Sequence, residues 1–434
     1  MGVFSWIANN IFGTPAIMLG AIVCVGLLLQ GKNVSQVIIG TSKAIIGFLI
    51  INAGSSVITG ALGIFSPIYQ QVFGIGSTAI SNFMGQDTFT NQFGSAVAIA
   101  MTFGFVINIL LARFTPFKYV YLTGHMMYWV TVIFAGIAVQ ATGGHVDFWP
   151  LTIFLSLIVG LYWTFQPAII QPLVQKVTGM EAVALGHTSC SAGILGYFGG
   201  KLFGAKKKDA EDLQIPKQLA FLRDSNVITA LTMGVLFLIG AILVLNKHTS
   251  EADALVASSG TQNFIVYVLI QSFTFAAGIA VVLTGVRMFI GEVVPAFKGI
   301  AQKVVPGAKP ALDAPFLYTF APNSVVFGFL GAFVGALIWM AILGSSVSYV
   351  FVPPMIALFF HGAVAGIFGN KTGGIWGALL GGFLCATLLA WGQYVMVTFF
   401  IGTTIPDTAL WAADCDMFIL GPIVGLLSKL LLLF

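Results

Sequence analysis

The segment Lys201–Asp224, KLFGAKKKDAEDLQIPKQLAFLRD, decides how this chain is organised. It contains six of the 18 Lys and Arg residues and four of the 14 Asp and Glu residues, whereas the sequence on both sides is mainly apolar. Loops rich in Lys and Arg stay on the cytoplasmic side of a membrane, so this segment is expected to be cytoplasmic. It is too short for a folded domain, and it divides the chain into halves of nearly equal length.

The composition places both halves in a lipid bilayer. Of the 434 residues, 58% are hydrophobic and only 7% are charged, whereas about 25% of the residues of a soluble protein are charged. Apolar runs of roughly 18–25 residues recur along the chain, and each is long enough to cross a bilayer core. The sequence therefore predicts an all-α, polytopic membrane protein with about 11 transmembrane helices.

The distribution of Lys and Arg gives the direction in which the helices cross. Residues 64–92 contain neither, whereas Lys32, Arg113 and Lys118 lie at the opposite ends of the neighbouring spans. The amino terminus is then outside and the linker inside, so the first half begins outside and the second begins inside. Such inverted topology is typical of transporters built from inverted repeats. The expected spans are 11–30, 36–54, 93–112, 119–141, 150–170, 227–245, 263–286, 325–344, 353–369, 375–398 and 416–434.

Three regions follow from this division. The first repeat is expected to comprise residues 1–204, the charged linker 205–225 and the second repeat 226–434. Residues 171–204 and 288–323 are apolar but interrupted by Gly and Pro, so they are expected to be broken or re-entrant segments. Irregular backbone at membrane depth is tolerated only where it is buried in protein or lines a cavity. Interrupted segments at corresponding places in two halves therefore point to a substrate site.

Two histidines stand in apolar surroundings. His125 lies in YLTGHMMYW (Tyr121–Trp129), and His187 lies in LGHTSC (Leu185–Cys190). Each follows a glycine, and His187 is also followed by Thr188. One interpretation is a structural histidine that is hydrogen-bonded to a neighbouring helix, and the other is a binding site. Ionisable residues within membrane segments usually mark functional sites, and the polar or interrupted surroundings favour the second interpretation.

Asp313 is the third candidate, because holding a carboxylate at membrane depth costs roughly 2.5–3.5 kcal/mol. The alternative is an ion pair with Lys309. His361 is either another cavity histidine or a helix-end residue, and the latter is favoured. Carboxylate, imidazole and hydroxyl groups suit a neutral or weakly acidic polyol, since a carboxylate accepts two hydroxyl protons and the other groups donate or accept. The aromatic faces of Tyr128 and Trp129 are suited to stacking on a sugar-like ring.

Several classes of function are disfavoured. The net charge of +4 is modest, and its Lys and Arg residues are spread over loops, so no nucleic-acid partner is expected. The sequence has no P-loop, no Gly-rich nucleotide motif and no H-E-x-x-H motif, so we expect no cofactor, no metal and no catalytic residue on this chain. The four cysteines are far apart and are interpreted as small apolar residues.

Six stretches of this sequence resemble a known family. They are GTSKAIIGFLIINAGSSVITG, YLTGHMMYW, LGHTSC, TGVRMFIGEVVPAFKGIAQKVVPGA, YTFAPNSVVFGF and GIFGNKTGG, and they occur in the family's order from about residue 15 to 400. The family is the ascorbate-type IIC component, or permease, of the bacterial phosphoenolpyruvate-dependent phosphotransferase system. The resemblance implies eleven spans per protomer, with a core domain that carries the substrate and a second domain that forms the interface of a homodimer.

The resemblance also implies a mechanism and partners. The core domain is expected to slide past the interface domain in an elevator-type motion in the bacterial cytoplasmic (inner) membrane. The substrate is then phosphorylated on the cytoplasmic side by a phosphocysteine of a separate IIB protein, which a IIA protein recharges. We expect neither a nucleotide site nor a IIB domain within this sequence, so the phosphoryl donor is expected to be another protein. Cys190 is expected to be a packing residue and not the phosphocysteine.

Carried over by position, the substrate-binding residues of the family fall mainly on the segments already singled out. Two positions differ, because Trp129 and Thr188 stand where ascorbate transporters have glutamine. The expected substrate is therefore ascorbate or a related sugar acid, lactone or pentitol. The implied substrate-binding residues are His125, Tyr128, Trp129, His187, Thr188 and Asp313, with Phe83 and Met84 from the second domain.

Two other functions remain open at this point. One is a proton-coupled secondary transporter of a small polyol or organic acid, in which His125 and Asp313 would carry protons. The other is a membrane redox enzyme in which His125 and His187 would be axial haem ligands.

Overall fold

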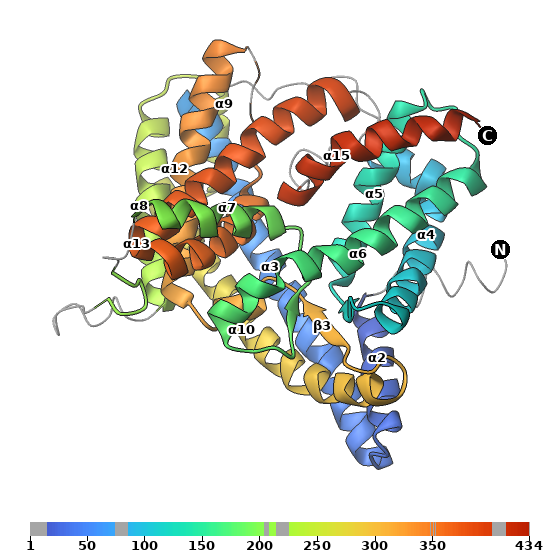
Figure 1. The fold of residues 1–434 in the computed structure, drawn as a ribbon. Coiled ribbons are helices and arrows are strands. Elements are labelled where there is room, and N and C mark those ends of the chain that lie inside the picture. Colours follow the sequence, from blue (N-terminus) through green and yellow to red (C-terminus); the bar gives the residue numbers. More distant parts are fainter. Residues whose placement is uncertain are drawn as a thin grey trace.

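The structure is a computed structural model, and it describes residues 15–73, 86–203, 208–213, 225–347, 349, 351, 353–401 and 414–433. Helices dominate these ranges, and three short strands complete them (Figure 1). The expected all-α membrane protein is confirmed in its broad class, while the small sheet was not expected.

The elements of the first half start with a helix of 15 residues and one of 40 residues. They are α2 (Pro15–Leu29), α3 (Val34–Phe73), α4 (Gln86–Phe114), β1 (Tyr119–Tyr121), α5 (Gly124–Ala141), α6 (Phe148–Thr178), β2 (Ala184–Leu185), α7 (Cys190–Gly200) and the 3₁₀ helix η2 (Lys201–Phe203).

The second half also has a 40-residue helix, α10, near its beginning. Its elements are α8 (Ser225–Leu245), α9 (Ser250–Ala257), α10 (Phe264–Lys303), β3 (Lys309–Leu312), α11 (Pro315–Tyr318), α12 (Pro322–Ser346), α13 (Met355–Val395), the π-helix η4 (Met396–Ile401), α15 (Cys415–Ser428) and the 3₁₀ helix η5 (Lys429–Leu433).

Within the described residues, six helical segments are long and apolar enough to cross a membrane. The protein is therefore a multi-pass membrane protein, whereas the total of about 11 spans and the inverted repeats remain predictions. The six segments are Gln92–Phe114, Phe148–Thr178, Phe264–Val281, Pro322–Ser346, Ala357–Ile401 and Cys415–Leu433, and shorter apolar helices occupy Val34–Ile50, Trp129–Ala141 and Met233–Leu245.

Helix α13 is divided at Gly374, which has φ 61° and ψ −152°. A Cβ atom at this position would lie 2.2 Å from the carbonyl oxygen of Lys208, so both the backbone conformation and the close contact require glycine. The two parts of α13 lie where the sequence predicts spans 353–369 and 375–398.

The interrupted segments are shorter than the sequence predicts. Helix α6 continues through Pro172 and ends at Gly179, which has φ 68°, and helix α10 continues through Pro295 to Lys303. Membrane helices tolerate proline because neighbouring groups satisfy the freed backbone atoms. A glycine in the left-handed conformation, in contrast, ends a helix. The non-helical backbone therefore begins at Gly179 and after Lys303.

The helices pack in two groups, and each group combines both halves of the chain. In the first group α3 packs along α10, and α2 and α8 pack beside them. In the second group α13 packs against α7 and α12, α4 packs against α6, and α15 packs against α5 and α13. Figure 1 shows the green α7 against the orange-red α13 and the blue α3 beside the yellow α10. Contacts between the two groups are much less extensive.

The three strands form a parallel sheet with the order β1-β3-β2 inside the second group. Tyr121 and Ala184 both pair with Ala311, on opposite sides of β3. The hydrogen bonds continue past the strand ends, from Leu122 N to Ala311 O at 3.0 Å and from Gly186 N to Leu312 O at 2.7 Å. The pairing satisfies backbone groups that have no access to water. Gly186 is required here, because a Cβ atom would lie 2.7 Å from Ala311 O.

The outer edge of β1 is closed by the side chain of Asn108 from α4. Its Nδ2 donates to Tyr119 O at 3.1 Å and to Thr164 Oγ1 at 2.9 Å, and its Oδ1 accepts from Tyr121 N at 3.0 Å. Asn108 is fully buried. The amide thus makes the backbone hydrogen bonds that a fourth strand would make, and it ties β1 to α4.

The described part of the linker is docked on the second group of helices. Glu211 Oε1 accepts from the backbone N and the Oγ of Ser324 at 2.8 Å each, and Oε2 accepts from Asn323 N at 3.1 Å. These groups belong to the first turn of α12, where backbone N–H groups lack partners within the helix and a negative charge is favourable. Asn370 of α13 also holds the linker, since its Oδ1 accepts from Ala210 N at 2.9 Å and its Nδ2 donates to Asp209 Oδ1 at 2.6 Å.

Candidate functional site

The three candidate residues of the sequence follow the three strands. His125 comes after β1, His187 after β2 and Asp313 after β3. Because the strands are parallel, their carboxyl ends lie at one edge of the sheet. Helices α5 and α7 begin within a few residues of this edge, so it also collects backbone N–H groups and the positive ends of two helix dipoles.

Four of the predicted residues lie wholly or partly outside the described residues. His125 and Tyr128 belong to α5, and their side chains lie outside the described residues, as do Phe83 and Met84 altogether. Trp129 of α5 is partly buried and packs against the hydrophobic core.

His187 and Asp313 lie next to each other. His187 is 2% exposed, and its Nε2 lies 3.7 Å from Asp313 Oδ1. The Nδ1 atom of the same ring lies 3.0 Å from Ser189 Oγ, so both ring nitrogens face polar atoms. Asp313 Oδ1 also accepts from the backbone N of Ala314 at 2.7 Å. Lys309, the partner that the sequence offers for Asp313, is the first residue of β3.

Thr188 connects this cluster with two more elements. The residue is fully buried, and its Oγ1 lies 2.6 Å from Asp414 Oδ2 and 3.4 Å from Met126 Sδ. Met126 is in the first turn of α5, so the segments YLTGHMMYW and LGHTSC meet in the structure. The backbone N of Asp416 also donates to Thr188 O at 3.0 Å. Both the side chain and the backbone carbonyl of Thr188 are thus bonded to the beginning of α15.

His361 and Asp414 form a second imidazole–carboxylate pair. His361 Nε2 lies 2.9 Å from Asp414 Oδ1, and the two residues are 1% and 4% exposed. The ring centroids of His361 and His187 are 5.0 Å apart. The interpretation of His361 as a helix-end residue is therefore wrong, because it is buried inside α13 beside His187.

Asp414 was not predicted from the sequence as a member of this cluster. A signal was present, since Asp414 and Asp416 stand directly before and within the last apolar run, where acidic residues are costly. The sequence did not predict that Asp414 contacts Thr188 and His361, which are far from it along the chain.

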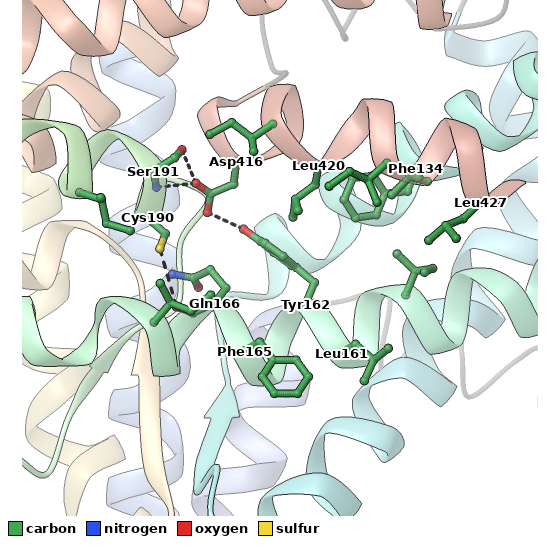
Figure 2. A pocket seen from close by; sticks show the side chains of 16 residues that line it. Phe134, Leu161, Tyr162, Phe165, Gln166, Cys190, Ser191, Asp416, Leu420 and Leu427 are labelled. Carbon is green, nitrogen blue, oxygen red and sulfur yellow. Dashed lines mark hydrogen bonds between the residues drawn. The ribbon is translucent and has the colours of Figure 1, made fainter.

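Asp416 binds different residues from Asp414. Its Oδ1 accepts from Ser191 N at 2.7 Å and Ser191 Oγ at 2.5 Å, and its Oδ2 accepts from Tyr162 OH at 2.9 Å. Figure 2 shows this carboxylate between Ser191 and Tyr162. Both oxygens therefore have donors, which a buried carboxylate requires.

A cavity of about 410 Å³ lies beside Asp416, between α5, α6, α7 and α15. Its lining includes Asp416 and Ser191 but not His187 or Asp313. It is otherwise mainly apolar, and Leu161, Ile169 and Ile423 of its rim are strongly exposed. Because its rim and most of its lining are apolar, we do not assign the polar substrate to this cavity. Cys190 lies at its inner end, 6% exposed, with Sγ 3.8 Å from Gln166 O (Figure 2).

Helices interrupted beside a buried polar cluster are the arrangement of a membrane transporter. Residues 10–416 match the family of the sugar-specific permease component of the phosphotransferase system, and the chain belongs to this family. It is similar to the ascorbate-specific phosphotransferase-system EIIC component of Mycoplasma pneumoniae, with 29% identity over 448 aligned residues. The alignment covers 91% of this chain and 66% of that protein, so the chain spans slightly less than two thirds of the relative's length.

Proposed function

We propose that this permease carries ascorbate, or a related sugar acid, lactone or pentitol, into the cytoplasm and releases it for phosphorylation by a separate IIB protein. The observation that carries the proposal is the cluster of His187, Asp313 and Thr188 at one edge of the sheet, next to the start of α5. The ascorbate-specific name of the relative supports the substrate class.

The chemistry of the cluster agrees with a polyhydroxylated substrate. A carboxylate accepts hydrogen bonds from hydroxyl groups, whereas imidazole and threonine donate or accept them. A site built to bond hydroxyl groups rejects analogues without them, because its buried polar atoms are then left unpaired. We propose that His125, Tyr128 and Trp129 of α5 complete this site, and that Phe83 and Met84 contribute to it from the other side.

Movement of the substrate is proposed to follow from the two groups of helices. The cluster belongs entirely to the second group of helices. The contacts of this second group with the first group, α2, α3, α8 and α10, are limited. An elevator-type motion would move the second group, with the cluster, past the first group. The first group would then form the interface of a homodimer in the bacterial cytoplasmic membrane.

The phosphoryl donor is proposed to be the phosphocysteine of IIB, with IIA upstream. The thiol of Cys190 is buried and faces the Gln166 carbonyl, which suits a packing residue better than a phosphoryl carrier. A carrier must be reached by two partner proteins in turn, and a buried thiol is not accessible to them.

Uptake into vesicles tests the proposal. Vesicles that contain the purified protein are loaded with phosphorylated IIB and given labelled ascorbate, gluconate or xylitol outside. We expect a phosphate ester to accumulate inside, and only with phosphorylated IIB. Free substrate that accumulates with a proton gradient and without IIB would contradict the proposal and support the proton-coupled alternative.

A further inference from the structure

The carboxylate of Asp414 does not cap its own helix. Asp414 is the N-cap residue of α15, and its side chain makes no hydrogen bond to the first turn. Aspartate at this position normally accepts from a backbone N–H two or three residues later. Here one oxygen meets Thr188 and the other meets His361. The side chain is thus committed to the candidate site, although its own helix offers it partners.

This contact fixes the direction of the Thr188 hydrogen bond. A hydroxyl group has one proton and two lone pairs, and an ionised carboxylate only accepts. The separation of 2.6 Å between Thr188 Oγ1 and Asp414 Oδ2 is that of a strong, charge-assisted bond. The proton of Thr188 therefore goes to Asp414, and what remains for a substrate is a lone pair.

His361 holds the carboxylate of Asp414 in place. Its Nε2 is 2.9 Å from Asp414 Oδ1, so this nitrogen carries the proton that the carboxylate accepts. In the neutral ring Nδ1 is then an acceptor. Among the described residues, this buried Nδ1 atom has no hydrogen-bond partner. The carboxylate of Asp414 is thus held by His361 through one oxygen and bonded to Thr188 through the other.

We infer that Asp414 and His361 are positioning residues that set the polarity of the substrate site: they hold Thr188 as a hydrogen-bond acceptor, so that the group facing it is a substrate hydroxyl and not a carbonyl or carboxylate oxygen. The inference rests on the proposed function and extends it to a specificity rule. Ascorbate transporters of the family that this sequence resembles have glutamine at this position. Glutamine offers both donors and an acceptor. Thr188 with Asp414 offers only the acceptor.

A double-mutant cycle tests this rule with the full-length protein in detergent or nanodiscs. The variants are Thr188→Val, Asp414→Asn and the double variant, and the measured quantities are the affinities for ascorbate and for its singly deoxygenated analogues. Each single variant should lose roughly 10–100-fold in ascorbate affinity. Each single variant should also lose the preference of the wild type for ascorbate over the deoxy analogue that lacks the hydroxyl group facing Thr188. The double variant should bind no more weakly than Thr188→Val, because Asp414 acts through Thr188.

The matched control is Asp416→Asn, a change of the same kind two residues further along α15. Asp416 bonds to Ser191 and Tyr162, so its loss should lower the melting temperature without changing the preference for hydroxyl over deoxy ligands. Thr188→Ser keeps the hydroxyl, so it should keep the preference for hydroxyl over deoxy ligands that Thr188→Val loses. If Asp414→Asn does not fold, the comparison of Thr188→Ser with Thr188→Val still tests the inference.

Three outcomes would overturn the inference. They are wild-type affinity in Asp414→Asn, a further loss of tenfold or more when Asp414→Asn is added to Thr188→Val, and equal affinity of Thr188→Val and wild type. If the wild type does not bind ascorbate, xylitol and its deoxy analogues are the probes. Binding of neither ascorbate nor xylitol by the wild type would count against the proposed function itself, and the inference would fall with it.

Discussion

The imidazole rings of His187 and His361 lie with their centroids 5.0 Å apart, one on the loop after β2 and the other inside α13. Each ring has its own carboxylate, Asp313 for His187 and Asp414 for His361. Four separate segments thus bring two imidazoles and two acids into one buried cluster. Removing one member of a buried hydrogen-bonded pair leaves the other without its partner, so single substitutions here should have large effects.

The first prediction concerns the pair nearest the sheet. Asp313→Asn and His187→Ala should each reduce substrate affinity by tenfold or more, because hydrogen bonds to charged groups are worth about 1.5–3 kcal/mol. Calorimetric binding measurements on the purified variants give the affinities. Glu292→Gln is the control, since Glu292 is 3.7 Å from Lys43 in the other group of helices and should leave affinity unchanged. Wild-type affinity in either site variant would remove that residue from the site.

The second prediction concerns the edge of β1. Asn108→Leu should lower the melting temperature clearly, because it leaves Tyr119 O and Tyr121 N unpaired in the interior, at a cost of about 1–3 kcal/mol for each buried group. Fluorescence-detected unfolding in detergent measures the change. Asn246→Leu is the control, because Asn246 is exposed and bonds only to Ile242 O in its own helix. Equal melting temperatures for the two variants would contradict this role of Asn108.

The third prediction concerns the division of α13. Gly374→Ala should destabilise the protein by at least about 1 kcal/mol, because alanine disfavours a positive φ and its Cβ would collide with Lys208 O. Gly291→Ala is the control. Nothing lies within 4 Å of a Cβ there, and alanine in a helix is favourable by about 0.5–1 kcal/mol. Thermal unfolding should therefore move in opposite directions, and a shared direction would be evidence against the strained turn.

The fourth prediction concerns Tyr162. Tyr162→Phe removes one of the donors to Asp416 and should destabilise the protein by about 1–3 kcal/mol. Substrate affinity should stay within twofold of wild type, because neither residue belongs to the candidate site. A large loss of affinity with unchanged stability would show that the cavity beside Asp416 takes part in substrate binding.

Much of the architecture could be predicted from the sequence, and the reason is the cost of polar groups in lipid. This cost explains why apolar runs mark helices, and why His187 and Asp313 stood out. The two broken segments, 171–204 and 288–323, remain a prediction. Within the second of them α10 runs through Pro295, because a membrane helix tolerates proline.

The sheet and the second imidazole–carboxylate pair were not predicted, for different reasons. Strands of two to four residues are too short for an alternating pattern of apolar and polar residues. The partners of Asp414 lie far away in the chain, and a single sequence carries no signal for such pairing. The assignment of His361 to a helix end failed for that reason.

The docking of residues 208–213 gives the two halves of the chain a built-in connector. Asp209 and Glu211 belong to the charged linker that follows the first half, and they are bonded to α12 and α13 of the second half. Two separately translated fragments, divided between residues 213 and 225, would each retain one side of this junction. Such fragments should find each other in the same bilayer through it, which makes the permease a candidate for split-protein complementation.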